Sequence, residues 1–554
     1  MCYNVLTMYI DVCKYKRGDK NYKRTLLRRG YRREGKVKHE TIANLSHLPD
    51  EEIEALRIAL KMKGDLVALK NLAEGKFKSG KMVGAVAALY QVANRLGITS
   101  ALGPGRNARL VLWLILARLI DQGSRLSAVR LAKNHTACEI LGLEPFTEDD
   151  LYAAMDWLYE NQEKIEEKLF RSREGKSSNL FLYDVSSSYV EGEKNELADW
   201  GYNRDGKKGK KQVVYGLLTD EEGEPIAIEV FRGNTKDNET VQNQITRLKE
   251  RFGCKHFTIV GDKGMIKSAQ IEQILGEELH FITSITKGQI RSLLHEGTLQ
   301  LEFFEETLCE VEDSENGVRY ILRRNPRRAG EIKKGRESKI QSIGKKVEKA
   351  NLYLREHPRA KAETQVKNLN EYVKKLRMDK MVRVEFDDRL NLQVDESAIA
   401  EAGSLDGCYV IKTDLPVVVA GKELVHRRYK SLSEVEWGFR TAKTGYLEAR
   451  PIYVRKAGRT SAHLFVVMLA YKIERYLRSA WSDLNMTVEE GVSTLSSITS
   501  SIIIIGEKKV VRVPVPDKRC CALLERIEVT LPKVLPYLEA DVATRKKLQK
   551  HRKG

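Results

Sequence analysis

The stretch NLFLYDVSSSYVEG, residues 179–192, places one acidic residue, Asp184, inside an apolar run of strand character. A second acid, Asp262, ends another apolar run in HFTIVGDKGM. A third, Glu436, lies in the helix-forming stretch YKSLSEVEWGFRTAK. We expect the three carboxylates to meet at one end of a sheet. Because 78 and 174 residues separate them in turn, this arrangement requires an insertion in the second interval.

Three carboxylates of this kind suit divalent metal ions. Mg²⁺ or Mn²⁺ prefers hard oxygen ligands and usually takes one or two carboxylates together with water and substrate phosphate. Two such ions about 3.5–4 Å apart can activate the attacking oxygen of a phosphodiester and stabilise the leaving oxygen. The pattern therefore predicts phosphodiester chemistry that needs no histidine base.

The stretch around Glu436 has helical periodicity. Tyr429, Leu432, Glu436 and Lys443 follow one another at offsets of 3, 7 and 14 from the first, which is one narrow face at roughly 100° per residue. A Glu and a Lys would then project toward the same substrate. The simpler alternative is an amphipathic helix whose Tyr and Leu pack on a core and whose Glu and Lys are solvated.

Together with the stretch GYNRDGKKGKKQVVYGLLTDEEGEPIAIEVFRGNTKDNET at 201–240, these motifs resemble bacterial insertion-sequence transposases of the DDE class. The similarity runs from about residue 179 to about 470 and is greatest to the branch whose last motif reads Tyr-x2-Arg-x3-Glu-x6-Lys. It implies an α/β fold with an RNase H-like catalytic core, a mixed sheet flanked by helices. It also implies that Asp184, Asp262 and Glu436 are the catalytic triad and the ligands of Mg²⁺ or Mn²⁺.

The resemblance further implies that Tyr429 and Lys443 contact DNA. Leu432 stands where the motif has Arg, so Arg440 or a neighbouring arginine is expected to supply the missing phosphate contact. The implied activity is cleavage of the ends of an insertion element and joining of the 3′-hydroxyl to target DNA, by a dimer that pairs two ends. The alternatives are a catalytically silent DNA-binding regulator and a metal-dependent nuclease of the same fold.

Composition agrees with a nucleic-acid partner. The 554 residues include 96 Lys and Arg against 77 Asp and Glu, a formal charge of +19, which favours salt-sensitive attraction to phosphate. The hydrophobic fraction of 42% is enough for several packed domains and excludes a disordered chain.

Cysteine and hydropathy patterns point to the cytoplasm. The eight cysteines form no C-x2-C pair, which argues against structural zinc and for free thiols in a reducing compartment. The longest apolar runs, at 110–120 and 464–471, fall short of the ~20 residues that span a bilayer. We expect a cytoplasmic, nucleoid-associated protein without a membrane partner and without a signal peptide.

Composition shifts divide the chain into six expected segments. These are a basic N-terminal hairpin and helix at 1–75, a mainly helical DNA-end-binding or dimerisation region at 76–178, the first half of the core at 179–290, an insertion at 291–405, the second half of the core with the Glu helix at 406–480, and a C-terminal region with a basic tail at 481–554. Within the helical region, two helices broken at 121–123 form either a DNA-reading helix-turn-helix, with Arg125 and Arg130 on its second helix, or a plain packing hairpin.

A basic loop follows the first expected strand. It carries the lysines Lys207, Lys208, Lys210 and Lys211. Near a metal site such a loop would contact DNA phosphate by charge, although a solvated hairpin tip would look the same. Trp200 either stacks on an unpaired base or packs on the sheet. Asp237 is expected to cap the helix that follows it.

Overall fold

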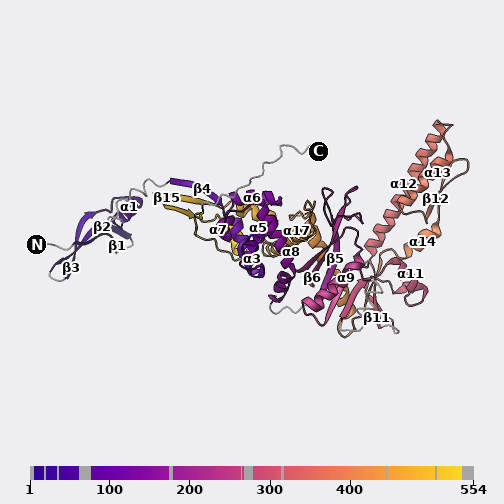
Figure 1. Cartoon of the computed structure of the whole chain (residues 1–554), viewed down its shortest axis with the longest axis horizontal. Helices are drawn as coiled ribbons and strands as arrows, with labels where there is room; N and C mark the ends of the chain where they lie inside the picture. Colours follow the sequence, from indigo (N-terminus) through magenta and orange to yellow (C-terminus); the bar gives the residue numbers. More distant parts are fainter. Residues whose placement is uncertain are drawn as a thin grey trace.

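The computed structural model describes residues 5–17, 20–33, 36–61, 76–173, 179–263, 265–266, 279–313, 317–444, 446–505 and 508–538. Figure 1 shows an elongated molecule with a small sheet at one end, a helical body in the middle, and a large sheet followed by a projecting helical arm at the other end.

The N-terminal sheet has three antiparallel strands, β1 (Val5–Arg17), β2 (Lys20–Arg33) and β3 (Lys36–Asn44), in the order β1-β2-β3. The helix α1 (Asp50–Lys61) follows. Its first turn contains three acidic residues, whose negative charges interact favourably with the positive end of the helix dipole.

The helical body is built around one apolar core. Its helices are α3 (Gly84–Arg95), α4 (Ile98–Leu102), α5 (Arg106–Ile120), α6 (Arg125–Asn134), α7 (Ala137–Leu141) and α8 (Glu148–Arg171). The break expected at 121–123 is present, because Ser124 caps the N-terminus of α6 by accepting a hydrogen bond from the backbone of Ser127. The fully buried Trp113 of α5 donates to the carbonyl of Ala128 in α6, so these two helices pack on each other.

The C-terminal segment completes this helical body. The strand β4 (Lys76–Met82) pairs with β15 (Thr499–Ile505), which continues to β16 (Lys508–Arg512) and β17 (Val534–Leu535) in the order β17-β16-β15-β4. Two short helices accompany these strands: α18 (Val488–Ser496) precedes β15, and α19 (Lys518–Arg526) lies between β16 and β17 in the chain. The two ends of the sequence on either side of the catalytic region therefore share one sheet and one core.

The large sheet has eight strands in the order β10-β11-β14-β9-β8-β5-β6-β7. Its strands are β5 (Leu180–Tyr189), β6 (Gln212–Asp220), β7 (Pro225–Phe231), β8 (Phe257–Gly261), β9 (Leu279–Ser284), β10 (Cys309–Asp313), β11 (Val318–Arg324) and β14 (Cys408–Thr413). The first three are antiparallel neighbours, while β8 and β9 run parallel to β5. This mixed sheet, flanked by helices, is an RNase H-like core, as the sequence predicted.

A helical segment connects β7 to β8. The helix α9 (Asp237–Thr246) runs into a π-helical turn, η1 (Arg247–Arg251), before β8. The helix predicted over 266–278 falls almost wholly outside the described residues.

The single helix predicted across 429–443 is two helices in the structure. The first, α15 (Lys422–Lys430), ends at Ser431, and the second, α16 (Leu432–Thr444), begins directly after it. The periodic face inferred from the sequence is therefore interrupted. Behind α16 lies the long buried helix α17 (Ala457–Ala480), which approaches closely because Gly438 has no side chain; a Cβ there would lie 3.2 Å from the ring of Tyr471.

The segment predicted as an insertion contributes to the main sheet. Its first part contains the helix α11 (Lys287–His295), the 3₁₀ turn η2 (Leu301–Phe303) and the strands β10 and β11. The part outside the sheet is thus shorter than 291–405 and begins with α12 (Pro326–Glu356). It continues through α13 (Ala362–Lys375), a hairpin of β12 (Val382–Phe386) and β13 (Leu390–Val394), and α14 (Glu396–Ser404).

The helical arm formed by α12, α13 and the β12–β13 hairpin has its own apolar cluster, and Figure 1 shows it projecting from the sheet. The basic tail predicted at the end of the chain lies outside the described residues. Within the described part of the chain, every helix is too short or too polar to cross a membrane.

Candidate active site

Asp184 and Asp262 lie on neighbouring strands at the same edge of the large sheet. The strands β5 and β8 are parallel, with Leu182 opposite Val260. Each aspartate is two residues further along its own strand or just past it, so the same register brings the two carboxylates side by side. Asp184 is half-buried and Asp262 is exposed.

Glu436 reaches this edge from α16, which packs against β5. Val435 and Phe439 turn to the core, where Phe439 meets the ring of Tyr215 at 5.6 Å between centroids. Glu436 lies on the exposed side of the helix. Because of this amphipathic pattern, the helix is fixed by its apolar face while its carboxylate remains accessible.

Asp184 interacts electrostatically with both other acids. Burial, followed by the negative charges of Asp262 and Glu436, raises the pKa of Asp184 to about 7. Arg204 and a hydrogen bond from the backbone N–H of Val185 oppose the shift. Three like charges that repel in this way form a site where a cation would be stabilised.

A tyrosine from the Glu motif holds Asp262. The Tyr429 hydroxyl lies 2.8 Å from Oγ of Ser284 at the end of β9 and 3.4 Å from Oδ1 of Asp262. The Asp262 carboxylate also accepts the backbone N–H of Lys263 at 2.7 Å. Burial, with the nearby charges of Asp262 and Glu436, raises the pKa of Tyr429 to about 12, so this hydroxyl remains a donor. Ser284 was not identified from the sequence, since a serine at a strand end carries no distinguishing pattern.

Lys443 is paired inside the protein. Its ammonium lies 3.2 Å from Oδ1 of Asp205, and Arg450 binds the same carboxylate. The other oxygen of Asp205 accepts the backbone N–H of Tyr189 at the end of β5. The sequence indicated a turn at Asp205-Gly206, and the structure adds that Asp205 anchors this turn to the Glu helix.

Arg204 is a second cation beside the acids. It binds both oxygens of Asp237, at 2.6 and 2.7 Å, and lies over the ring of Tyr202. The expectation that Asp237 caps α9 is therefore wrong. Lys236 occupies the N-cap position, and Asp237 is the first residue of the helix, where its carboxylate binds Arg204. This pair could not be predicted from the sequence, because 33 residues separate its members.

The remaining basic residues are placed differently from one another. Lys207 and Lys208 are exposed at the tip of the loop, Lys211 is half-buried, and Lys210 is 2.7 Å from Glu191. Arg440 is exposed on α16 beside the ring of Trp437. Trp200 is 60% exposed, so the expectation that it packs on the sheet is wrong.

The two arginines considered for DNA reading on α6 also differ. Arg125 is buried, at 9% exposure, whereas Arg130 is exposed. Arg125 therefore cannot read DNA from this surface, and the packing-hairpin alternative accounts for its place in the helical body.

The donor set agrees with a hard divalent cation in chemical type. Asp184, Asp262 and Glu436 offer carboxylate oxygens, and their mutual repulsion is what a cation relieves. Among the described residues, no three His, Cys, Asp or Glu side chains are close enough to form one coordination shell. A magnesium site needs only one or two carboxylates per ion, so a shell of three is not required.

Two family models match this chain. The model of the transposase DDE domain matches residues 175–473, more than half of the chain, and the model of the IS1634 family transposase N-terminal domain matches residues 10–68. The chain belongs to the insertion-sequence transposases of the DDE class. The matched region spans the large sheet, the arm, the Glu helix and most of α17, so the family assignment covers all three acids of this transposase.

Among the solved structures that match the transposase, one is similar over much of its length. It is a piggyBac transposase synaptic complex with hairpin DNA, at 8% sequence identity and a TM-score of 0.37, covering 70% of this chain and 69% of that one. A TM-score of this size does not support conclusions about the site. Curated proteins yield no match.

Leu432, the position at which the sequence resemblance suggested a missing arginine, is buried in the transposase at 9% exposure. Leu432 is the first residue of α16, and it packs into the core. A side chain at position 432 that points into the core as Leu432 does would not reach DNA phosphate.

Proposed function

We propose that this transposase cleaves DNA at the ends of an insertion element and joins the exposed 3′-hydroxyl to a target strand. The observation that carries the proposal is the convergence of Asp184, Asp262 and Glu436, from two neighbouring parallel strands and one helix, at one edge of the sheet. In this role the three carboxylates would hold Mg²⁺ or Mn²⁺. Bound in pairs, such ions activate the attacking oxygen and stabilise the leaving oxygen of a phosphodiester.

Other residues of this chain support the acids. Tyr429 and Ser284 would fix the orientation of the Asp262 carboxylate, since the tyrosine hydroxyl bridges them. Arg204, held by both oxygens of Asp237, would offset part of the negative charge near Asp184 before substrate binds. A preoriented set of ligands loses less conformational freedom when substrate and metal arrive.

DNA contact is proposed for the cations and aromatic groups around this edge. The candidates are Lys207, Lys208, Lys210, Lys211, Arg440 and Tyr429, with Trp200 available to stack on an unpaired base. For Lys443 we propose a supporting role through Asp205, because its ammonium is buried in that pair. The DNA would be that of the nucleoid in the cytoplasm.

A strand-transfer assay on DNA that carries the element's own ends tests the proposal. Asp184→Asn, Asp262→Asn and Glu436→Gln should each abolish cleavage and joining while end binding, measured by mobility shift, is retained. Glu434→Gln is the matched control, since Glu434 lies on the same helix, is 46% exposed and pairs with Arg475. It should retain activity.

The same assay separates the alternatives. End binding without cutting by the wild-type protein in Mg²⁺ or Mn²⁺ would identify a DNA-binding regulator. Cutting without joining would identify a nuclease. Full activity in any of the three acid variants would remove that residue from the proposed site.

We also propose that the active species is a homodimer on two paired ends, because each site serves one end and an element has two. The helical region 76–178 and the segment 481–554 are the proposed contact. Since β4 and β15 pair, these two parts of the sequence belong to the same body. Light scattering with and without end DNA measures the mass: one chain on one end, still competent for strand transfer, would contradict the dimer.

A further inference from the structure

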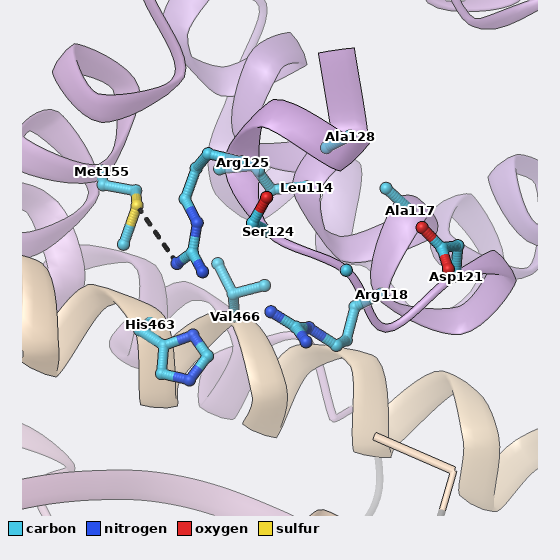
Figure 2. Close-up of a pocket in the computed structure, with 11 residues that line it drawn as sticks. Leu114, Ala117, Arg118, Asp121, Ser124, Arg125, Ala128, Met155, His463 and Val466 are labelled. Atoms are coloured by element: carbon cyan, nitrogen blue, oxygen red, sulfur yellow. Dashed lines mark hydrogen bonds between the residues drawn. The ribbon is translucent and has the colours of Figure 1, made fainter. Parts of the chain in front are cut away.

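Two buried arginines, Arg118 at the end of α5 and Arg125 at the start of α6, line the same cavity in the helical body. The enclosed part is about 20 Å³, and it adjoins a larger pocket of about 470 Å³ that both arginines also line. His463 and Val466 of α17 form the opposite wall. Figure 2 shows both guanidinium groups turned toward the space beside Val466 and His463.

Among the described residues neither arginine forms an ion pair with a carboxylate, although the charge of Glu148 acts on Arg125. Arg118 donates from Nη1 to the carbonyl of Gln122 at 2.7 Å, and Nη1 of Arg125 lies 4.0 Å from the sulfur of Met155. Within the described part of the chain, no carboxylate oxygen is within ion-pair distance of either side chain. They are 8% and 9% exposed. Two like charges buried in this way are costly unless a negative group accompanies them.

The surroundings leave the positive charge of this site uncompensated. Burial and the charge of Arg125 lower the pKa of Arg118 to about 9, and burial, with the charges of both arginines, lowers the pKa of His463. His463 hydrogen-bonds the carbonyl of Ala449 through Nε2. The larger pocket is also lined by Ser124 and Arg125 at the start of α6, where the first N–H groups of the helix form the positive end of its dipole.

Two carboxylates of the lining are engaged or peripheral. Asp121 accepts a hydrogen bond from the Ser127 hydroxyl at 2.6 Å, and Glu448 is exposed to solvent. Both lie within electrostatic range of Arg118 without closing an ion pair. Arg450, at the far wall of the larger pocket, is already bound to Asp205.

We propose that this pocket is a binding site for a phosphate group, held by Arg118 and Arg125 with the N-terminus of α6. Paired guanidinium groups suit the oxygens of phosphate, and a helix N-terminus adds N–H donors. The pocket is large enough for inorganic phosphate or a terminal phosphate monoester. The two sources share this chemistry, and the site goes beyond the cleavage and joining proposed for the three acids.

The site also has a physical connection to the acids. Arg450 belongs to both the pocket and the buried cluster of Asp205 and Lys443, which anchors the loop beside Asp184. An occupant bound to Arg118 and Arg125 would therefore share its pocket with a residue of that buried cluster.

The test uses the full chain and inorganic phosphate. Melting temperature is measured against phosphate concentration and, at matched ionic strength, against chloride. Phosphate should raise the melting temperature of the wild-type protein in a saturable manner, as expected for a ligand of the folded state. Arg118→Met and Arg125→Met should lose this rise. Arg130→Met is the matched control, since Arg130 is exposed on the same helix, and it should retain the rise.

A substitution can change the melting temperature for reasons other than phosphate binding. Phosphate affinity is therefore also measured by isothermal titration calorimetry, after circular dichroism has verified that each variant is folded. Retained phosphate binding in both arginine variants, or no rise beyond chloride in the wild type, overturns the site. Oligonucleotides with a 5′-phosphate or a 5′-hydroxyl identify the source. A preference of tenfold or more for the 5′-phosphate that Arg125→Met abolishes assigns the site to a DNA end; equal binding of both, with inorganic phosphate still bound, assigns it to a free phosphate.

Discussion

Lys443 and Asp205 form an ion pair inside the transposase, with Nζ 3.2 Å from Oδ1 and side chains that are 9% and 1% exposed. The pair joins the last residue of the Glu motif to the basic loop across 238 positions of sequence. Arg450 shares the same carboxylate. The loop beside Asp184 is thereby attached to the helix that carries Glu436.

Asp205→Asn should destabilise the protein. The substitution leaves Lys443 and Arg450 buried without a counter-charge, and breaking a buried pair in this way costs about 3–5 kcal/mol. The measurement is the midpoint of thermal and denaturant unfolding. Glu191→Gln is the control, because it breaks a solvent-accessible pair with Lys210 and should cost much less stability. Equal effects of the two substitutions would contradict a structural role for Asp205.

Tyr429→Phe should lower cleavage about fivefold while the protein folds normally. The variant loses the hydroxyl that bridges Ser284 and Asp262, and one net hydrogen bond is worth about 1 kcal/mol. Cleavage rate at saturating DNA is the measurement. Tyr159→Phe serves as the control, since Tyr159 is 51% exposed on α8. An unchanged rate in Tyr429→Phe would show that the bridge is dispensable.

Lys207→Ala combined with Lys208→Ala should weaken end binding and flatten its salt dependence. Each phosphate contact contributes a slope of about −0.9 in the logarithm of affinity against the logarithm of salt concentration, so two contacts change the slope by about 1.8. Titrations at several salt concentrations measure it. The pair Lys164→Ala and Lys168→Ala, exposed on α8, is the control and should leave the slope unchanged.

Because His463 is buried, we expect the free energy of unfolding to decrease in mild acid. Its folded-state pKa lies well below the ordinary value of 6.5, because it is buried and lies near Arg125 and Arg118. Below pH 6.5 the unfolded chain therefore binds a proton that the folded chain does not, and stability falls as pH falls, by about 1 kcal/mol or more at pH 5.5.

The measurement compares unfolding of the wild type and His463→Gln at pH 7.5 and 5.5. The variant should lose less stability over this interval. His295→Gln, which alters an exposed histidine, should behave like the wild type. If His463→Gln and the wild type lose the same stability, His463 does not control the acid response.

Local pattern was enough to predict much of the sheet. The strands around Asp184 and Asp262, and those at 212–220 and 225–231, are apolar runs bounded by turn residues, and each is present. The break between α5 and α6 was also predictable, since Asp121, Gln122 and Gly123 interrupt the apolar periodicity. These features depend on residues that are neighbours in the sequence, so they can be predicted from one amino-acid sequence.

The assignment of β10 and β11 could not be made in this way. Their residues, in CEVEDSENGVRYILRR, indicate a hairpin, but a hairpin pattern does not say which sheet it joins. Pairing of β11 with β14, far along the chain, decides it. The same limit explains Ser431, where the helix ends although periodicity continues through the position.

By itself the sequence determined the secondary structure of the core, the basic character of the chain, and three acids in strand and helix settings that resemble a DDE site. The tertiary structure decided which of the nearby charges are free to act. Burial and pairing between residues distant in sequence place Lys443 on Asp205, Arg204 on Asp237 and Arg125 in a cavity, and leave Trp200, Lys207 and Lys208 at the surface. The reason is physical: periodicity records which face of an element is apolar, whereas the partner of a charge depends on how distant elements pack.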